Sequence, residues 1–85
     1  MEDRETIFDR IAGDNFQAAV RTDDRIEEHA GMLVDYPEMG RIGRVAGTHE
    51  LVIANTPYIA AYVIVGDAIR ILRVLHGAQE WPEYF

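Results

Sequence analysis

A histidine near the carboxyl end of this 85-residue chain is a first candidate for chemistry. His76 closes the apolar segment Ile71-Leu-Arg-Val-Leu-His76. An imidazole at the end of a strand can transfer protons near neutral pH. A single histidine in such a place is more often structural, so both interpretations stay open.

A glutamate in the middle of an alternating segment is the second candidate. Glu50 stands between His49 and Leu51, in a stretch with strand-like alternation where glutamate is disfavoured. It could act as a general base, or pair with an arginine on the sheet. The simplest interpretation places it on the solvent face.

All eight cationic side chains are arginines, a residue suited to bidentate contacts with carboxylate or phosphate. A coding sequence biased toward arginine codons would produce the same composition. Arg70 and Arg73 are an odd number of residues apart, so a regular strand places them on opposite faces. The same parity places Arg70 on the face of His76, unless a bulge intervenes.

Charge and composition exclude several classes of function. The net charge of −7 argues against a general nucleic-acid binder. The three histidines share no metal-ligand spacing and cysteine is absent, so we expect no metal site and no cofactor. The glycines near residues 40 and 43 match neither a dinucleotide fingerprint nor a P-loop.

The length allows one domain, which we assign to residues 1–85. The absence of cysteine fits a reducing cytosol. The longest apolar run, residues 58–65, is too short to span a bilayer, and the first residues are acidic rather than signal-like. We therefore expect a cytoplasmic protein that does not enter the membrane.

Two stretches with helical periodicity occupy the first part of the chain. The pattern predicts helices over residues 2–12 and 16–34, with Pro37 ending the second. A three-residue turn between them predicts an antiparallel hairpin. We expect its apolar stripe to face a sheet through Ile7, Phe8, Ile11, Val20, Ile26 and Leu33.

The second part of the chain has the period of strands. Residues 48–54, 58–65 and 68–76 predict three strands, joined by turns at Asn55-Thr56-Pro57 and Gly66-Asp67. Residues 38–45 predict a loop. The expected fold class is α+β, a two-helix hairpin on a three-stranded antiparallel sheet.

Several segments, read in order, resemble the RelE/ParE superfamily of toxins from type II toxin–antitoxin modules, often called plasmid stabilisation proteins. The resemblance covers about residues 3–82. It rests on the segments Pro37-Glu-Met-Gly-Arg41, Gly47-Thr-His-Glu-Leu-Val-Ile53, Pro57-Tyr-Ile-Ala-Ala-Tyr-Val-Ile64 and Ile71-Leu-Arg-Val-Leu-His-Gly-Ala-Gln-Glu-Trp-Pro82.

The resemblance implies a toxin that arrests growth in one of two ways. ParE-like members trap DNA gyrase on cleaved DNA, and RelE-like members are metal-independent endoribonucleases that cut mRNA on the ribosome. If the chain is a nuclease, His76, Glu50 and Arg73 are the catalytic candidates. A site binding the target would use Arg41, Arg44, Arg70 and Trp81. The central strand reads Tyr58-Ile-Ala-Ala61 where several nucleases have an arginine, so gyrase is slightly favoured.

The resemblance also implies a cognate antitoxin, which we expect on the hairpin near Phe8, Ile11 and Phe16. Family members usually begin with a strand, whereas Met1 here stands directly before the residues of the first helix. We expect this first strand to be missing, which leaves a bare sheet edge for a homodimer or for the antitoxin. A third possibility is an inactive, truncated form that only binds antitoxin.

Overall fold

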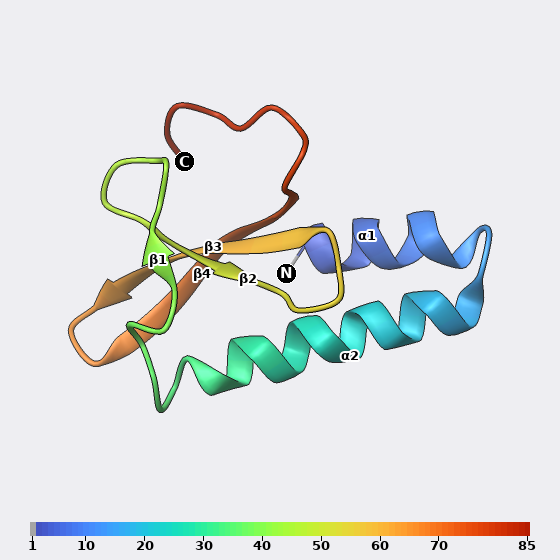
Figure 1. Ribbon diagram of the computed structural model, residues 1–85, viewed down its shortest axis with the longest axis horizontal. Helices are drawn as coiled ribbons and strands as arrows, with labels where there is room; N and C mark the ends of the chain where they lie inside the picture. Colours follow the sequence, from blue (N-terminus) through green and yellow to red (C-terminus); the bar gives the residue numbers. More distant parts are fainter. Residues whose placement is uncertain (1) are drawn as a thin grey trace.

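A helical layer and a sheet layer make up the protein. The computed structural model describes residues 2–85, with α1 (Glu2–Ala12) and α2 (Phe16–Met32) preceding all the strands. Figure 1 shows the two helices side by side along one side of the molecule, with the strands and the C-terminal segment beyond them. The α+β class predicted from the sequence is confirmed.

The turn between the helices is closed by an N-cap. The side chain of Asn15 accepts a hydrogen bond of 3.0 Å from the amide of Ala18, which satisfies one of the free donors in the first turn of α2. The predicted ends of α1 agree with the structure, and α2 ends two residues earlier than predicted, at Met32.

The sheet has four antiparallel strands in the order β1-β2-β3-β4, one more than predicted. The strands are β1 (Arg41–Ile42), β2 (His49–Val52), β3 (Tyr58–Val65) and β4 (Ala68–His76). The prediction of a loop over residues 38–45 was wrong for β1. A two-residue strand has no period to detect, and its pairing with β2 is what defines it.

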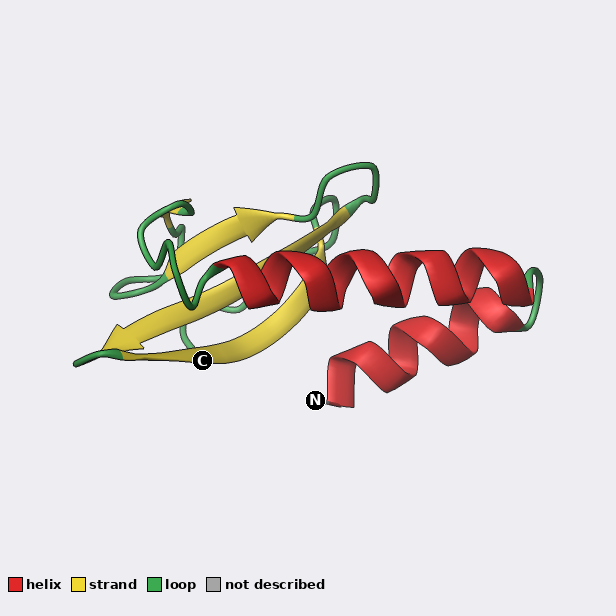
Figure 2. Cartoon of the chain, turned by 90° about the horizontal axis from the view of Figure 1, so that it is seen from below, coloured by secondary structure: helices red, strands yellow, loops and turns green. Residues whose placement is uncertain are grey.

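One face of the sheet packs against the helices to form the main core (Figure 2). Ile7, Ile26 and Leu33 are buried there, and Ile11 packs against them. The prediction was wrong for Val20, which is 37% exposed, and Phe8 lies outside this core cluster. The sheet covers only part of the hairpin, and the far turn of the helices extends beyond it (Figure 2).

The other face of the sheet is covered by the β1–β2 connection and the C-terminal segment. Ala61, Ile59 and Leu75 lie on this face and are all less than 9% exposed. Figure 1 shows the C-terminal segment on the side of the sheet away from α2. The sheet is therefore buried on both faces near its centre.

No helix within residues 2–85 has the length and apolar character needed to cross a membrane.

Candidate functional site

Glu50 is the centre of an ion-pair network on the sheet face turned away from the helices. Its side chain is 2% exposed. Arg41 lies opposite it in the β1–β2 register and donates from Nη2 to Oε1 at 3.0 Å. Arg44 donates from Nε to Oε2 at 3.1 Å, and its backbone amide donates to the same oxygen at 2.6 Å. The solvent-face interpretation of Glu50 was wrong, and the predicted pairing with arginine is confirmed.

The protonation of Glu50 follows from these contacts. Burial alone would raise the pKa of this carboxyl group, but hydrogen bonds from the side chain and amide of Arg44 and from Arg41 outweigh it. The pKa of Glu50 is therefore lowered below its ordinary value. A carboxylate with a lowered pKa and several donors is a weak proton acceptor, so Glu50 is poorly suited to act as a general base.

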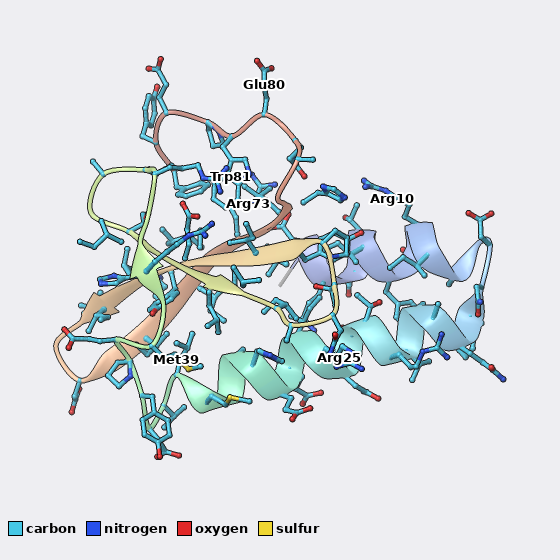
Figure 3. All side chains as sticks on the ribbon, in the orientation of Figure 1. Arg10, Arg25, Met39, Arg73, Glu80 and Trp81 are labelled. Carbon is cyan, nitrogen blue, oxygen red and sulfur yellow. The ribbon has the colours of Figure 1, made fainter. Side chains whose placement is uncertain are left out.

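The C-terminal segment contributes an aromatic ring to the same network. The guanidinium carbon of Arg44 lies 3.9 Å from the centre of the Trp81 ring, within the range of a cation–π contact. The indole nitrogen of Trp81 donates to the carbonyl of His76 at 3.3 Å. Figure 3 shows Trp81 on the C-terminal segment, on the side of the sheet away from α2. Three of the predicted target-binding residues, Arg41, Arg44 and Trp81, thus lie together.

His76 lies on the opposite face of the sheet from Glu50. It pairs in register with Tyr58, a residue of the main core, and the two rings meet edge to face with centroids 5.6 Å apart. Its Nδ1 accepts a hydrogen bond of 3.0 Å from the amide of Ala78, and its own amide donates to Gln79. His76 therefore organises the turn after β4, which is a structural role.

A β-bulge decides where the arginines of β4 point. Ala61 pairs with Arg73 but Tyr62 pairs with Ile71, so β4 contains one extra residue at this point. Arg70 pairs with Val63 and therefore lies on the same face as Arg73, away from His76. The parity argument, which placed Arg70 with His76, was wrong because it assumed a regular strand.

Arg73 is bound to the start of α1. Its Nε donates to Oδ2 of Asp3 at 2.7 Å, and the same oxygen accepts from the amide of Val74 at 2.9 Å. Sequence reasoning missed Asp3, because the two side chains are 70 residues apart and no local pattern connects them. Of the three nuclease candidates, Arg73 and Glu50 are held by structural ion pairs and His76 lies on the other face. They do not form one site.

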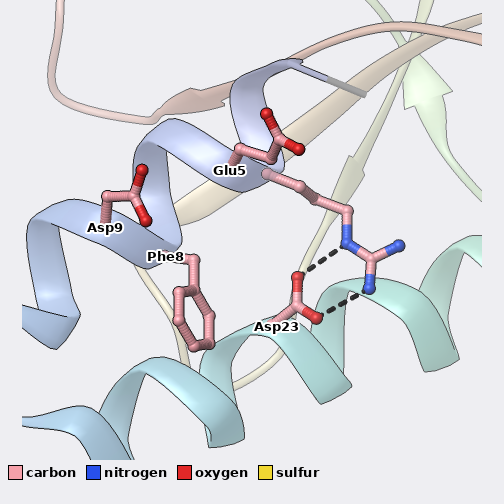
Figure 4. Close-up of a pocket in the computed structure, with 5 residues that line it drawn as sticks. Glu5, Phe8, Asp9 and Asp23 are labelled. Atoms are coloured by element: carbon pink, nitrogen blue, oxygen red, sulfur yellow. Dashed lines mark hydrogen bonds and ion pairs between the residues drawn. The ribbon is translucent and has the colours of Figure 1, made fainter.

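The hairpin carries a cleft of about 540 Å³ between α1 and α2, lined by Arg4, Glu5, Phe8, Asp9 and Asp23 (Figure 4). Phe8 meets Phe16 edge to face, with centroids 5.7 Å apart, and Phe16 is 63% exposed. Two of the residues predicted to bind antitoxin thus form an accessible aromatic pair. The third, Ile11, packs against the main core.

Three carboxylates on α2 lie close enough together to suggest a cation site. Oxygens of Asp23, Asp24 and Glu27 are within 4.8 Å of one another. The Nε of Arg4 already donates to Asp23 at 2.7 Å, a contact drawn as a dashed line in Figure 4. The Nη2 of Arg4 lies 3.4 Å from Glu27. A guanidinium therefore supplies the positive charge there, and we assign no metal to this cluster.

We expect stability to fall in acid because of three carboxylates. The pKa values of Glu50, Asp3 and Asp23 are all lowered, and each pairs with arginine. A lowered pKa means that the folded protein binds fewer protons than the unfolded chain. The stability that these three carboxylates contribute is complete above about pH 5. It is lost as the pH falls through their lowered pKa values, below about 4.

Urea denaturation between pH 3 and 7 measures this dependence. Replacing Glu50 with glutamine should make the decline at low pH shallower, whereas Glu28→Gln on the surface of α2 should leave it unchanged. If the free energy of unfolding declines equally with falling pH in the Glu50→Gln variant and the wild type, this carboxylate does not contribute to the acid dependence of stability.

Comparison with known proteins agrees with the fold and the sequence pattern. A family described as "ParE toxin of type II toxin-antitoxin system, parDE" matches residues 1–81. The protein Y4kP of Sinorhizobium fredii, which is named as a toxin, is 44% identical over 73 residues, covering 86% of this chain and 75% of that protein. Toxin RelE2 of Caulobacter vibrioides is 33% identical over 79 residues, covering 93% of this chain and 88% of that protein.

A solved structure described as the chromosomal ParDE toxin–antitoxin system from P. aeruginosa superposes with a TM-score of 0.76 at 26% identity. The match covers 86% of this chain and 82% of that one.

Proposed function

Because the chain belongs to the ParE toxin family of type II toxin–antitoxin systems, we propose that it arrests growth by binding DNA gyrase in the cytoplasm and trapping it on cleaved DNA. Membership of the family implies a cognate antitoxin as partner. The identity of the target, DNA gyrase, is the part of this function that we propose.

The separation of the three nuclease candidates is the observation that supports gyrase. Cutting RNA without a metal ion requires a group that removes the 2′-hydroxyl proton, near another that stabilises the charged phosphate. Glu50 already accepts hydrogen bonds from Arg41 and Arg44, and His76 faces the helical core. Arg73 is paired with Asp3. A toxin that acts by binding needs no such convergence.

An RNA-cleaving function is the second candidate, and two observations favour it. The Nδ1 of His76 accepts from Ala78, so the proton of the neutral ring is on Nε2, from which it can donate a hydrogen bond to a phosphate oxygen. The similarity to a relative named RelE2 points in the same direction.

Replacing His76 with alanine separates these two functions. We expect the variant to keep arresting growth, and induced cells to accumulate gyrase–DNA cleavage complexes without new mRNA ends. The measurements are complex isolation and mapping of mRNA 5′ ends, with His29→Ala as the matched control. Wild-type mRNA cleavage that disappears in the His76→Ala variant would contradict the gyrase proposal. An absence of growth arrest in the wild type would contradict both functions.

We also propose that the outer edge of β4 pairs with another strand. No strand within residues 2–85 covers this edge, where the amide of Val74 donates to Asp3 and the amide of His76 donates to Gln79. An unpaired edge favours the addition of a strand, from the antitoxin or from a second copy of the chain.

Light scattering at micromolar concentration should detect a species larger than the 9.6 kDa monomer. A purely monomeric protein that also binds antitoxin without protecting the β4 amides from exchange would rule this out.

A further inference from the structure

The cluster of Arg41, Arg44 and Glu50, which we call the arginine clamp, contains more positive charge than its own carboxylate requires. One guanidinium is enough to neutralise a buried glutamate, yet two are bound to Glu50. Among residues 2–85, no other carboxylate forms an ion pair with either arginine. The clamp therefore has a surplus of one positive charge, which is available to a single anionic group.

The surplus charge is accessible and held in place. The side chains of Arg41 and Arg44 are 56% and 41% exposed, while Glu50 is 2% exposed. Each arginine uses Nε and Nη2 to bind Glu50, which leaves Nη1 of both as free donors. The Trp81 ring restrains Arg44 further. Guanidinium groups that are already ordered lose little entropy when they bind a carboxylate or a phosphate.

The surroundings of the clamp favour a protein over a nucleic acid. Binding of a duplex relies on neutralising several phosphates, and this chain carries a net charge of −7. Trp81 offers no open platform for a base, because Arg44 lies over its ring and Phe85 lies near it at 6.4 Å between centroids. Val52, on the same face of the sheet as Glu50, is 50% exposed, and Phe85 is 40% exposed. Arginine next to exposed aromatic and apolar side chains is typical of the centre of a protein interface.

We propose that the arginine clamp receives one aspartate or glutamate side chain of the toxin's target protein, and that this contact contributes a large part of the binding affinity. The inference rests on the proposed function, in which the target is DNA gyrase. Glu50 acts here as a positioning residue: it orients both guanidiniums and does not itself meet the target.

The test measures the affinity of purified DNA gyrase for the Arg41→Gln and Arg44→Gln variants. The matched control is Arg21→Gln, which removes the same charge from an exposed position on α2. We expect each clamp variant to bind gyrase at least about tenfold more weakly, and the control to bind like the wild type. Arg41→Lys keeps the positive charge but loses the planar set of guanidinium N–H donors, and it should bind with intermediate affinity. Melting curves verify the fold of each variant, and binding to the cognate antitoxin is measured in parallel.

The outcomes separate the clamp from the proposed function. If wild-type toxin binds gyrase and both clamp variants bind equally well, the clamp inference fails and the gyrase proposal stands. If the wild type does not bind gyrase, the proposed function fails, and the clamp inference with it. Weaker binding to the cognate antitoxin alone would assign the clamp to the antitoxin. Weaker binding to a free DNA duplex, with a reduced dependence on salt, would assign it to a phosphate. Both of the last two results overturn the proposal.

Discussion

Replacing Ile26 with aspartate is expected to remove a large part of the protein's free energy of unfolding. Ile26 is 1% exposed and lies in the main core with Leu33 and Tyr62. The change removes a buried aliphatic side chain and leaves a carboxylate without a partner, which together should cost roughly 3 kcal/mol or more. A domain of this length has a total stability of about 4–13 kcal/mol. Thermal and urea denaturation, followed by circular dichroism, measure the loss.

Val34→Asp is the matched control for this experiment. Val34 follows α2 and is 78% exposed, so the same new charge should change stability by no more than about 0.5 kcal/mol. A melting temperature for Ile26→Asp that equals the wild-type value would show that α2 does not pack against the sheet through this residue.

Replacing Gly40 with alanine should destabilise the protein and also disturb the arginine clamp. A Cβ atom at this position would lie 2.5 Å from the hydroxyl of Tyr62 and 2.7 Å from the carbonyl oxygen of Glu50. Tyr62 is fully buried, and its hydroxyl accepts from the Gly40 amide and donates to the carbonyl of Pro37. Neither neighbour has room to move, so β1 must shift away from β2.

We expect a cost of about 2–3 kcal/mol, in the range of overpacked cores, with weaker binding of the target because Arg41 shifts with β1. Gly31→Ala is the control: its Cβ would meet nothing within 4 Å, and alanine in a helix is favoured over glycine by up to about 1 kcal/mol. Denaturation of both variants side by side checks the prediction. It fails if Gly40→Ala is as stable as Gly31→Ala.

Features that depend on local periodicity could be predicted from the sequence alone. The bounds of α1, β3 and β4 agree with the predicted ones, because each has enough residues to display a helical or alternating pattern. The α+β class followed from the order of these patterns. The family resemblance came from short segments between Pro37 and Pro82, and the comparisons support it.

The candidate site depended on pairings that no local pattern contains. The burial of Glu50 arises because the two-residue strand β1 brings Arg41 opposite it, and a strand this short has no period. The bulge in β4 turns Arg70 to the face of Arg73, since one extra residue reverses the alternation of every side chain that precedes it. Asp3 meets Arg73 only because α1 packs beside β4. The sequence by itself thus determined the longer elements and the family. Tertiary structure decided which charges meet, because ion pairs depend on distance in space and not on separation along the chain.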